Sequence, residues 1–290
     1  MHSIENNFLK VTVKDKGAEL TSLFNKETNT EILWQGNPDF WAGQAPILFP
    51  IVGELKDGYH IHEGNKYEMH RHGFVRKSSN WNIEIKNDTT IECTFKSTPE
   101  TIAIFPFSFD LKVRYHLDKK ELSITHYVVN TGTINMPVSI GGHPAFNCPL
   151  NDKTTLEDYY LKFEKTENAK KHLLNDKSLL SKKTEDCLQN TNKLQLSETI
   201  FNNDALIFKD LKSEKISLCG PAGEILSVSY PYFPFMGIWS KPKAPYVCIE
   251  PWIGHADTAN SDHNLFNKEG SITLKPNQDY TASYYITIPE

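Results

Sequence analysis

The sequence lacks several features that would assign it to a well-known class. It has no apolar run near the roughly 20 residues of a membrane-spanning helix, and its first residues contain neither the basic stretch nor the apolar core of a signal peptide. Its formal net charge of −5, with only three arginines, argues against a general affinity for nucleic acid or anionic membranes. These absences predict a cytoplasmic protein with a small-molecule partner, present as a monomer or weak homodimer.

Paired cysteines are also missing. The five cysteines are an odd, scattered set without CxxC spacing, namely Cys93, Cys148, Cys187, Cys219 and Cys248. This pattern disfavours both a disulfide framework and a zinc site. We therefore expect reduced thiols, no metal and no cofactor.

What the sequence does contain is many short runs in which apolar and polar residues alternate, the pattern of half-buried strands. The runs are Leu9 to Val13, Trp81 to Ile85, Ile91 to Phe95, Leu111 to Tyr115, Leu122 to Val128, Ala205 to Phe208, Lys215 to Leu218, Ile225 to Tyr230, Tyr246 to Ile249, Ser271 to Leu274 and Thr281 to Ile288. Because no helical segments of 10 to 15 residues separate them, they predict an all-β protein built as a large antiparallel sandwich.

Helix is expected only as short turns, at 37–42 and around 176–182. The polar, lysine-rich stretch at 165–197 reads as a long surface excursion rather than a linker. No repeat or composition change marks a boundary, so we predict a single domain over residues 1–290.

Three segments combine histidine, arginine or carboxylate with glycine, proline and aromatic residues. The first, His-Arg-His-Gly-Phe-Val-Arg at 70–76, contains two of the three arginines. Arginine offers a planar fork of donors suited to paired hydroxyls or a phosphate, which lysine cannot imitate. A surface loop with chance clustering is the alternative.

The other two segments each contain one notable side chain. In 140–149 a strand ends in two glycines followed by His143 and a proline, and in 246–254 Glu250 interrupts an apolar strand before Trp252. A histidine can change charge near neutral pH, and a carboxylate among apolar neighbours becomes more basic. Either side chain could instead be structural, satisfied by hydrogen bonds to the backbone.

At these segments the chain resembles the aldose 1-epimerase (galactose mutarotase-like) family, and within it the bacterial LacX-like branch. The likeness runs nearly end to end, through Phe-Pro-Ile-Val-Gly at 49–53, His-Gly-Phe-Val-Arg at 72–76, Gly-Gly-His-Pro-Ala-Phe at 141–146, Asn-Asp-Ala-Leu-Ile-Phe at 203–208 and Glu-Pro-Trp at 250–252. Their shared order is more specific than any one string.

The resemblance implies a galactose mutarotase-like β-supersandwich with a sugar in an open cleft. It also implies that His143 is the general acid and Glu250 the general base of an isomerase acting on a hexose. By the same matching, the ligands of the sugar would be His72, Arg76, Asp204 and, less directly, Arg71, with Trp252 available to stack on the ring.

The chemistry implied is ring opening: a base removes the proton of the C1 hydroxyl while an acid protonates the ring oxygen, and the ring recloses from the other face. These roles require Glu250 ionised and His143 protonated at the start, and predict a bell-shaped dependence of rate on pH. No metal, nucleotide or covalent intermediate is needed.

Other functions stay open at this point. A hexose-6-phosphate 1-epimerase would use the same pair, with Arg71 and Arg76 on the phosphate, although Glu54 would repel an anion if it faced the cleft. A non-catalytic carbohydrate-binding protein would keep aromatic platforms such as Trp252, Phe74 and Trp239. A glycoside hydrolase would need a second carboxylate, for which only Asp204 is a candidate.

Overall fold

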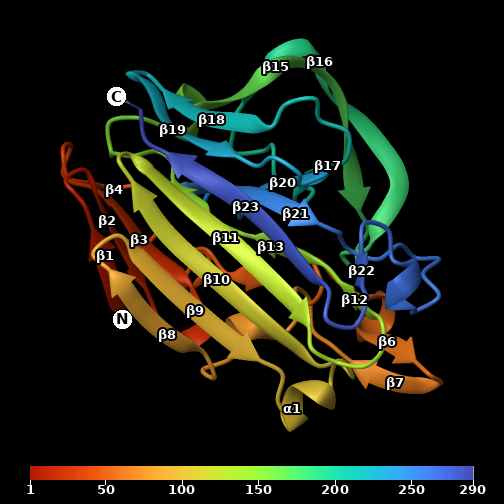
Figure 1. Ribbon diagram of the computed structural model, residues 1–290. Coiled ribbons are helices and arrows are strands. Elements are labelled where there is room, and N and C mark those ends of the chain that lie inside the picture. The colour runs from red at the N-terminus through yellow and green to blue at the C-terminus, as the bar shows by residue number, and fades with distance from the viewer. Residues whose placement is uncertain (290) are drawn as a thin grey trace.

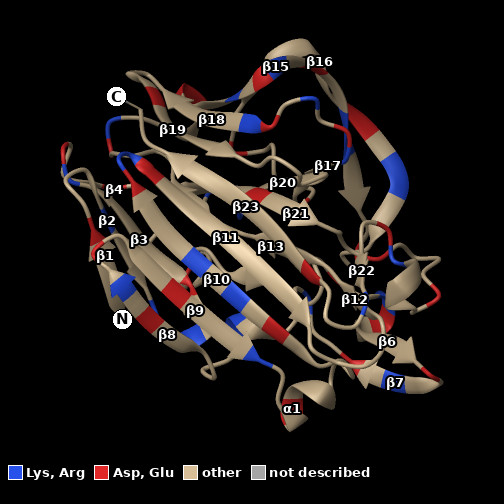
Figure 2. Ribbon diagram, in the orientation of Figure 1, with Lys and Arg blue, Asp and Glu red and all other residues tan. Residues whose placement is uncertain are grey.

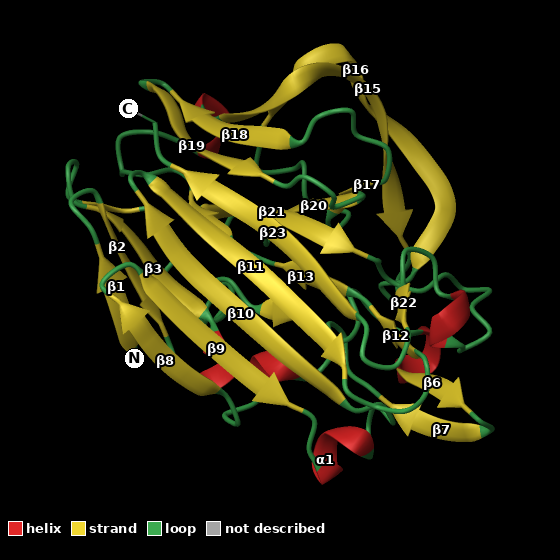
Figure 3. Ribbon diagram, in the orientation of Figure 1, coloured by secondary structure: helices red, strands yellow, loops and turns green. Residues whose placement is uncertain are grey.

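The computed structural model describes residues 1–289, which form β-strands joined by turns and short helices (Figures 1 and 3). Within those residues the helical elements are α1 (Pro99–Ile102) and the 3-10 segments Lys16–Ala18, Lys56–Gly58, Val75–Lys77, Leu156–Asp158 and Leu265–Asn267. None of the helices in this part of the chain is long and apolar enough to cross a membrane. The prediction of an all-β protein is confirmed.

The main feature is a 15-stranded sheet in which every pairing is antiparallel. Its order is β5 (Ile47–Leu48), β13 (Ile140–Gly142), β21 (Tyr246–Ile253), β20 (Phe235–Trp239), β17 (Leu206–Phe208), β15 (Tyr160–Leu174), β18 (Lys215–Gly220), β19 (Gly223–Ser229), β23 (Asp279–Thr287), β11 (Glu121–Asn130), β10 (Phe109–Asp118), β9 (Thr90–Lys96) and β8 (Asn82–Asn87). Beside this path, β14 (Ala145–Asn147) pairs with β21, and β16 (Leu180–Gln195) pairs with β15.

Three smaller sheets complete the fold. One contains β1 (His2–Glu5), β2 (Leu9–Val13), β3 (Leu20–Asn25) and β4 (Thr30–Glu31); the second pairs β12 (Met136–Val138) with β22 (Ile272–Leu274); and the third pairs β6 (Tyr59–His62) with β7 (Asn65–Glu68).

The strands face one another across a hydrophobic core because their side chains alternate. In β10 and β11 every second residue is buried and its neighbours are partly exposed, which is the period of a strand with one wet face. The same core cluster contains Ile124 of β11, Ile238 of β20 and Ile249 of β21. The two ends of the long sheet therefore enclose a common core, and the sandwich prediction is confirmed.

Acidic and basic residues both occur along β9 and β10 (Figure 2), and in β10 they fall at the positions that are not buried. Arg114 of β10 donates to Glu92 of β9 at 2.6 Å, and Lys112 lies 3.8 Å from the same carboxylate. The third arginine of the sequence is thus one of these residues.

The eleven predicted strands each overlap an observed strand, the helical turn predicted at 37–42 is present as one isolated turn, and the helical turn predicted around 176–182 is wrong. At 37–42 the chain makes a turn in which the Asn37 carbonyl accepts from the amides of Phe40 and Trp41, without continuing as a helix. At 175–179 it makes the turn of a hairpin, closed by the side chain of Asn175.

Most of the stretch at 165–197 consists of two paired β-strands. It forms most of the long β15–β16 hairpin, which arches away from the sheet and returns toward it at its tip (Figure 1). The tip is tied down where the Leu180 amide donates to the Asp257 carbonyl at 2.7 Å. Several register shifts between β15 and β16 give the hairpin its irregular course.

Candidate active site

His143 and Glu250 meet because of the register along β21. The strands β13 and β14 pair with β21 in one continuous register, Gly141 opposite Trp252 and Ala145 opposite Cys248. His143 lies in the gap between β13 and β14, at the position that this register places opposite Glu250. These two residues, about a hundred positions apart in the sequence, are therefore neighbours in the structure, but they do not stand apart on opposite sides of a space for the C1–O5 edge of a sugar, as their acid and base roles would lead one to expect.

The two side chains are in direct contact. His143 Nε2 lies 3.3 Å from Glu250 Oε2, and both residues are buried, with His143 8% and Glu250 1% exposed. This distance leaves no space for a sugar between them. A substrate would instead meet the pair from one side, which suits the C1 hydroxyl and the ring oxygen of a hemiacetal because both are bonded to the same carbon.

A cavity of about 450 Å³ opens beside the pair, within the usual range for small-molecule sites of roughly 300–1,000 Å³. All seven residues that the sequence singled out line it. The complete lining is Trp41, Pro46, Leu48, Arg71, His72, Arg76, His143, Phe201, Asn202, Asp204, Ala205, Trp239, Pro242, Glu250 and Trp252.

Strand β21 serves both the core and this cavity. Its alternate residues Val247, Ile249 and Ile253 belong to the main core cluster, whereas Glu250 and Trp252 face the cavity. The neighbouring strand β20 provides space for the indole: Gly237 pairs with Glu250, and a Cβ at Gly237 would lie 2.4 Å from the Trp252 ring. The glycine is thus required by the tryptophan beside it.

The segment at 70–76 reaches the cavity through an unusual backbone. His72 has a φ of 65°, and Asp204, on another wall, has a φ of 71°, so two of the proposed sugar ligands adopt the left-handed conformation that non-glycine residues rarely take. At Gly73 a Cβ would lie 2.0 Å from the Phe49 carbonyl oxygen, so this close approach requires glycine.

Two donors compete for the imidazole of His72. The Gly53 amide lies 3.1 Å from Nδ1, and Arg71 Nε lies 3.2 Å from Nε2. Because a neutral imidazole accepts at only one of its nitrogens, both contacts cannot be good hydrogen bonds together. An oxygen in the cavity that accepts from His72 or from Arg71 would remove this conflict.

The two arginines are incompletely satisfied by the protein. Arg71 Nη1 donates to Ser178 Oγ at 3.4 Å, and Arg76 Nη2 donates to the Arg71 carbonyl at 3.1 Å. Arg76 Nε is buried without a hydrogen-bond partner. Asp204 uses one carboxylate oxygen on its neighbouring amide, Ala205, at 2.8 Å. The cavity wall therefore retains unused donors as well as acceptor capacity.

Burial dominates the electrostatics of the pair. Loss of solvent raises the pKa of Glu250 well above its usual value, with the nearby Arg71 opposing the shift and Asp204 adding to it. Burial lowers the pKa of His143 to about 3, and Arg71 adds to that shift. The pKa of His72 is also lowered, by burial and then by Arg71. These shifts favour neutral Glu250 and neutral His143 in the free protein, opposite to the ionisation states expected from the sequence.

A third potential ligand lies beside the pair. The ligand atoms of His143, Cys248 and Glu250 are all within 4.8 Å of one another, and all three residues are buried. The spacing of the cysteines did not indicate this grouping, because the pairing of β13 and β14 with β21 is what brings His143 close to Cys248. The structure thus contains a nitrogen, a sulfur and an oxygen donor in one small volume.

Sequence reasoning identified Trp239 as a possible aromatic platform but missed Trp41, and both line the cavity. The Trp41 ring is stacked on His143, with ring centres 4.8 Å apart, and Trp239 meets the same imidazole edge to face at 5.7 Å. Trp41 lies in the 37–42 turn, where an aromatic residue next to glycine and proline is the one feature that could have identified it. Phe201 and Asn202, in the turns before β17, had no distinctive pattern.

Other residues that were considered lie elsewhere. Phe74 packs on Phe95 and Phe109 in the core, so it is not a sugar platform. Glu54 does not line the cavity; its backbone carbonyl accepts from the Asp257 amide. The objection that Glu54 would repel an anionic substrate is therefore removed.

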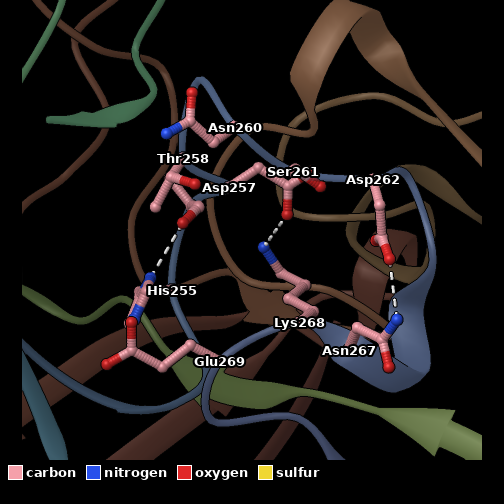
Figure 4. A pocket seen from close by; sticks show the side chains of 10 residues that line it. His255, Asp257, Thr258, Asn260, Ser261, Asp262, Asn267, Lys268 and Glu269 are labelled. Carbon is pink, nitrogen blue, oxygen red and sulfur yellow. Dashed lines mark hydrogen bonds and ion pairs between the residues drawn. The ribbon is translucent and has the colours of Figure 1, made fainter.

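His255 belongs to a second cavity, of about 350 Å³, beyond the end of β21 (Figure 4). Its polar groups are largely paired: Lys268 donates to Asp257 at 2.6 Å, and Asn267 donates to Asp262 at 2.7 Å. His255 Nε2 lies 3.3 Å from Glu269. No aromatic residue lines this cavity.

Comparison with known proteins agrees with this geometry. The family model described as aldose 1-epimerase matches residues 1–287. The plasmid-encoded protein LacX of Lactococcus lactis subsp. lactis is 34% identical over 98% of each chain. A galactose mutarotase related enzyme from Lactobacillus acidophilus superimposes with a TM-score of 0.94 at 34% identity, covering 100% of this chain and 97% of that one. A galactose mutarotase-like protein from Lactobacillus casei gives 0.93 at 29% identity, with both chains fully covered.

Proposed function

The chain belongs to the aldose 1-epimerase family, and from that premise we propose that it interconverts the α and β anomers of a hexose, with His143 and Glu250 as its acid/base pair. The observation on which this rests is the 3.3 Å contact between His143 Nε2 and Glu250 Oε2 at the wall of a cavity of suitable size. Membership of the family implies an isomerase that acts on carbohydrates; catalysis by this chain, the individual sugar and the residue roles are part of the proposal.

In the proposed mechanism the pair shares one proton. A neutral Glu250 beside a neutral His143 contains the same number of protons as an ionised Glu250 beside a protonated His143, and the two forms differ by one transfer across 3.3 Å. Burial favours the neutral form in the free site. Hydroxyls of a bound sugar that donate to Glu250 stabilise its carboxylate and shift the pair toward the charged form.

Ring opening then uses both groups. The Glu250 carboxylate removes the proton from the C1 hydroxyl, the C1–O5 bond breaks as the carbonyl forms, and O5 takes the proton of His143. The pair is left in its neutral form, the one that burial favours. Because burial disfavours charged groups, the site stabilises the complex with the open-chain sugar, in which the pair is neutral, relative to the complex with the cyclic sugar, in which the pair is charged. Rotation about C1–C2 and the reverse transfers close the ring from its other face.

The remaining lining residues fit the binding of a polyhydroxylated ring. Arg71, Arg76 and His72 offer donors, Asp204 offers an acceptor, and Trp252 and Trp41 provide apolar surfaces for the carbon faces of the sugar. The competition between Gly53 and Arg71 for His72 is relieved by a hydroxyl oxygen at that position.

A second candidate is epimerisation of a hexose 6-phosphate. Two observations favour it: Arg71 and Arg76 both line the cavity, and Glu54, which could have opposed an anion, does not. Against it, Asp204 adds a negative charge to the same wall. A purely binding role fits less well, because a buried, partnerless carboxylate oxygen at Glu250 costs stability without serving recognition.

Polarimetry tests the proposal. Freshly dissolved α-glucose, α-galactose and their 6-phosphates are followed with and without the protein, and at least one should reach its anomeric equilibrium faster with the protein. Initial rates across the panel distinguish free from phosphorylated sugars. Failure to accelerate any member of a broader panel of aldoses would reject the proposed activity. The pair should give a bell-shaped pH profile, since gaining a second proton or losing its only one abolishes the transfer.

A further inference from the structure

Cys248 occupies a position that the acid/base chemistry does not use. It lies two residues before Glu250 on β21, so both side chains point to the same face of the strand. Cys248 is fully buried and its thiol lies within 4.8 Å of the ligand atoms of His143 and Glu250. Position alone could reflect packing, since a free cysteine often acts as a small apolar side chain.

Two further observations indicate a ligand rather than simple packing. Glu250 Oε2 makes no hydrogen bond, although His143 Nε2 lies 3.3 Å from it, and His143 Nδ1 is buried without a hydrogen-bond partner. Buried polar atoms are normally paired, so orphans of this kind require an explanation. Here they belong to two of the three residues that surround the same small volume.

The three donors form a set that suits a particular class of ion. Imidazole nitrogen, thiolate sulfur and carboxylate oxygen are the ligands of Zn²⁺ in proteins, at bond lengths that separate neighbouring ligand atoms by roughly 3.3–3.8 Å. Ligand atoms within 4.8 Å need side-chain shifts of only about 1 Å to reach this spacing. Three protein ligands leave a fourth position, which would face the cavity.

Charge also favours a divalent ion at this place. A thiolate and a carboxylate together neutralise two positive charges, so the loaded site is uncharged, as a dry environment requires. On binding, the thiol S–H of Cys248 and the carboxyl O–H of Glu250 lose their protons to solvent, and His143 binds as the neutral imidazole. Two protons leave for one ion, so affinity should rise with pH.

We infer that His143, Cys248 and Glu250 form a binding site for Zn²⁺ or another thiophilic divalent cation, and that the bound ion blocks the acid/base pair. The binding site stands on the geometry alone. The blocking effect rests on the proposed function, because an ion ligated by both catalytic groups prevents either from transferring a proton. This inference departs from the expectation of no metal, which rested on cysteine spacing, because His143 lies about a hundred residues before Cys248 and Glu250 in the sequence.

Cobalt provides a direct test, because Co²⁺ bound to a thiolate has a charge-transfer absorption in the near ultraviolet. Co²⁺ is titrated into chelator-treated full-length protein. The wild type should develop this band with one equivalent, and Cys248→Ser should lose it. Cys187→Ser, which removes a more accessible thiol on β16, is the matched control and should keep it. No band in the wild type, or an unchanged band in Cys248→Ser, would overturn the site.

A second variant tests the ligand set independently, in case Cys248→Ser fails to fold. Glu250→Gln removes a different donor and should weaken Co²⁺ binding by more than about tenfold, since even changes to residues behind the ligands cost 10–100-fold. Thermal melting of each variant verifies that it is folded. Unchanged Co²⁺ affinity in Glu250→Gln would contradict the proposed ligand set.

Activity measurements separate the two parts of the inference. Zn²⁺ should inhibit the wild-type epimerase, Mg²⁺ should not because it prefers oxygen ligands, and Cys248→Ser should keep its metal-free rate and lose its sensitivity to Zn²⁺. Equal inhibition of wild type and Cys248→Ser would reject blocking at this site. If the wild type has no epimerase activity at all, the proposed function fails while the cobalt titration still decides the metal site.

Discussion

Two buried polar regions follow one another along the C-terminal part of the chain and differ in how their charges are satisfied. In the cavity, Glu250 and His143 touch at 3.3 Å and each retains a buried atom without a hydrogen-bond partner. Beyond the end of β21, Asp257 accepts from Lys268 at 2.6 Å (Figure 4) and from the Lys56 amide at 3.0 Å, although His255 Nε2 in the same region makes no hydrogen bond. Both side chains of that ion pair are 3% exposed.

The difference separates stabilising from reactive polar groups. A buried ion pair with additional hydrogen bonds has lost most of its tendency to exchange protons, whereas an under-satisfied acid/base pair keeps it at a cost in stability. Substitutions in the cavity should therefore change mainly turnover, whereas substitutions around the Asp257–Lys268 ion pair should change mainly the stability of the fold.

The largest expected effect is on turnover in the cavity. Glu250→Gln removes the base without changing the shape of the side chain, and should lower the epimerase rate about 10²- to 10⁴-fold. Its melting temperature should equal or exceed that of the wild type near neutral pH, because the raised pKa of Glu250 means that the unfolded chain ionises more readily than the folded one. Polarimetry and thermal melting on the same sample measure both; full activity at intact stability would reject the assigned role.

The next effect is on folding, in the satisfied region. Lys268→Met leaves Asp257 buried without its cation and should lower the free energy of unfolding by about 3–5 kcal/mol. Turnover per folded molecule should stay at the wild-type level. Urea unfolding measures the loss, and Lys275→Met, at an exposed position, is the control. A large fall in rate without loss of stability would show that this region takes part in catalysis.

In acid, the buried histidines of the two regions should respond alike, although the raised pKa of Glu250 adds a slope of opposite sign in the cavity. Burial lowers the pKa of His143 to about 3 and that of His255 to about 4. The pKa of a histidine in the unfolded chain is about 6.5, and the stabilisation that each buried neutral histidine contributes is fully present above that pH. As the pH falls from 6.5 toward the pKa of the histidine in the folded protein, the free energy of unfolding decreases by about 1.4 kcal/mol per pH unit for each histidine. Urea unfolding between pH 6.5 and 4.5 should show the slope, and His143→Gln and His255→Gln should each flatten it equally. An unchanged slope in one variant would mean that its histidine is not buried as neutral imidazole.

The smallest effect should come from the hairpin tip, which touches both regions. Ser178 accepts from Arg71 at 3.4 Å, and removing this weak contact should raise KM roughly two- to threefold, equivalent to about 0.5 kcal/mol, with kcat unchanged. The comparison is Ser178→Ala against Ser181→Ala, whose hydroxyl bonds only within the hairpin. Equal KM values for both variants would exclude a positioning role for Ser178.

Local patterns were enough to predict most of the fold. The alternation in β10 and β11 identified them as half-buried strands, because one face of each contacts the core and the other faces solvent. The same reasoning failed at 176–182, where a polar stretch looked like a helical turn. There the Asn175 side chain closes a hairpin turn, and nothing in the flanking residues indicates how far two twisted strands extend.

The site was predictable only as far as motifs could be matched. His143 and Glu250 were named from their surroundings and from the family resemblance, but their side-by-side contact depends on the shared register of β13 and β14 with β21. Trp41 was missed because its contact with His143 joins segments about a hundred residues apart. The direction of the pKa shifts in the free protein could not be predicted for a related reason: burial of a side chain is a property of the packed fold, not of its immediate neighbours in sequence.

The β15–β16 hairpin separates the evolution of substrate choice from that of the catalytic apparatus. At its base it pairs with β18, and at its tip it reaches Arg71, with an arm of irregular register in between. Adding or removing equal numbers of residues in both arms would move the tip relative to the cavity without altering any pairing of β21. Such length changes would alter the cavity wall near Arg71 and leave His143 and Glu250 in place.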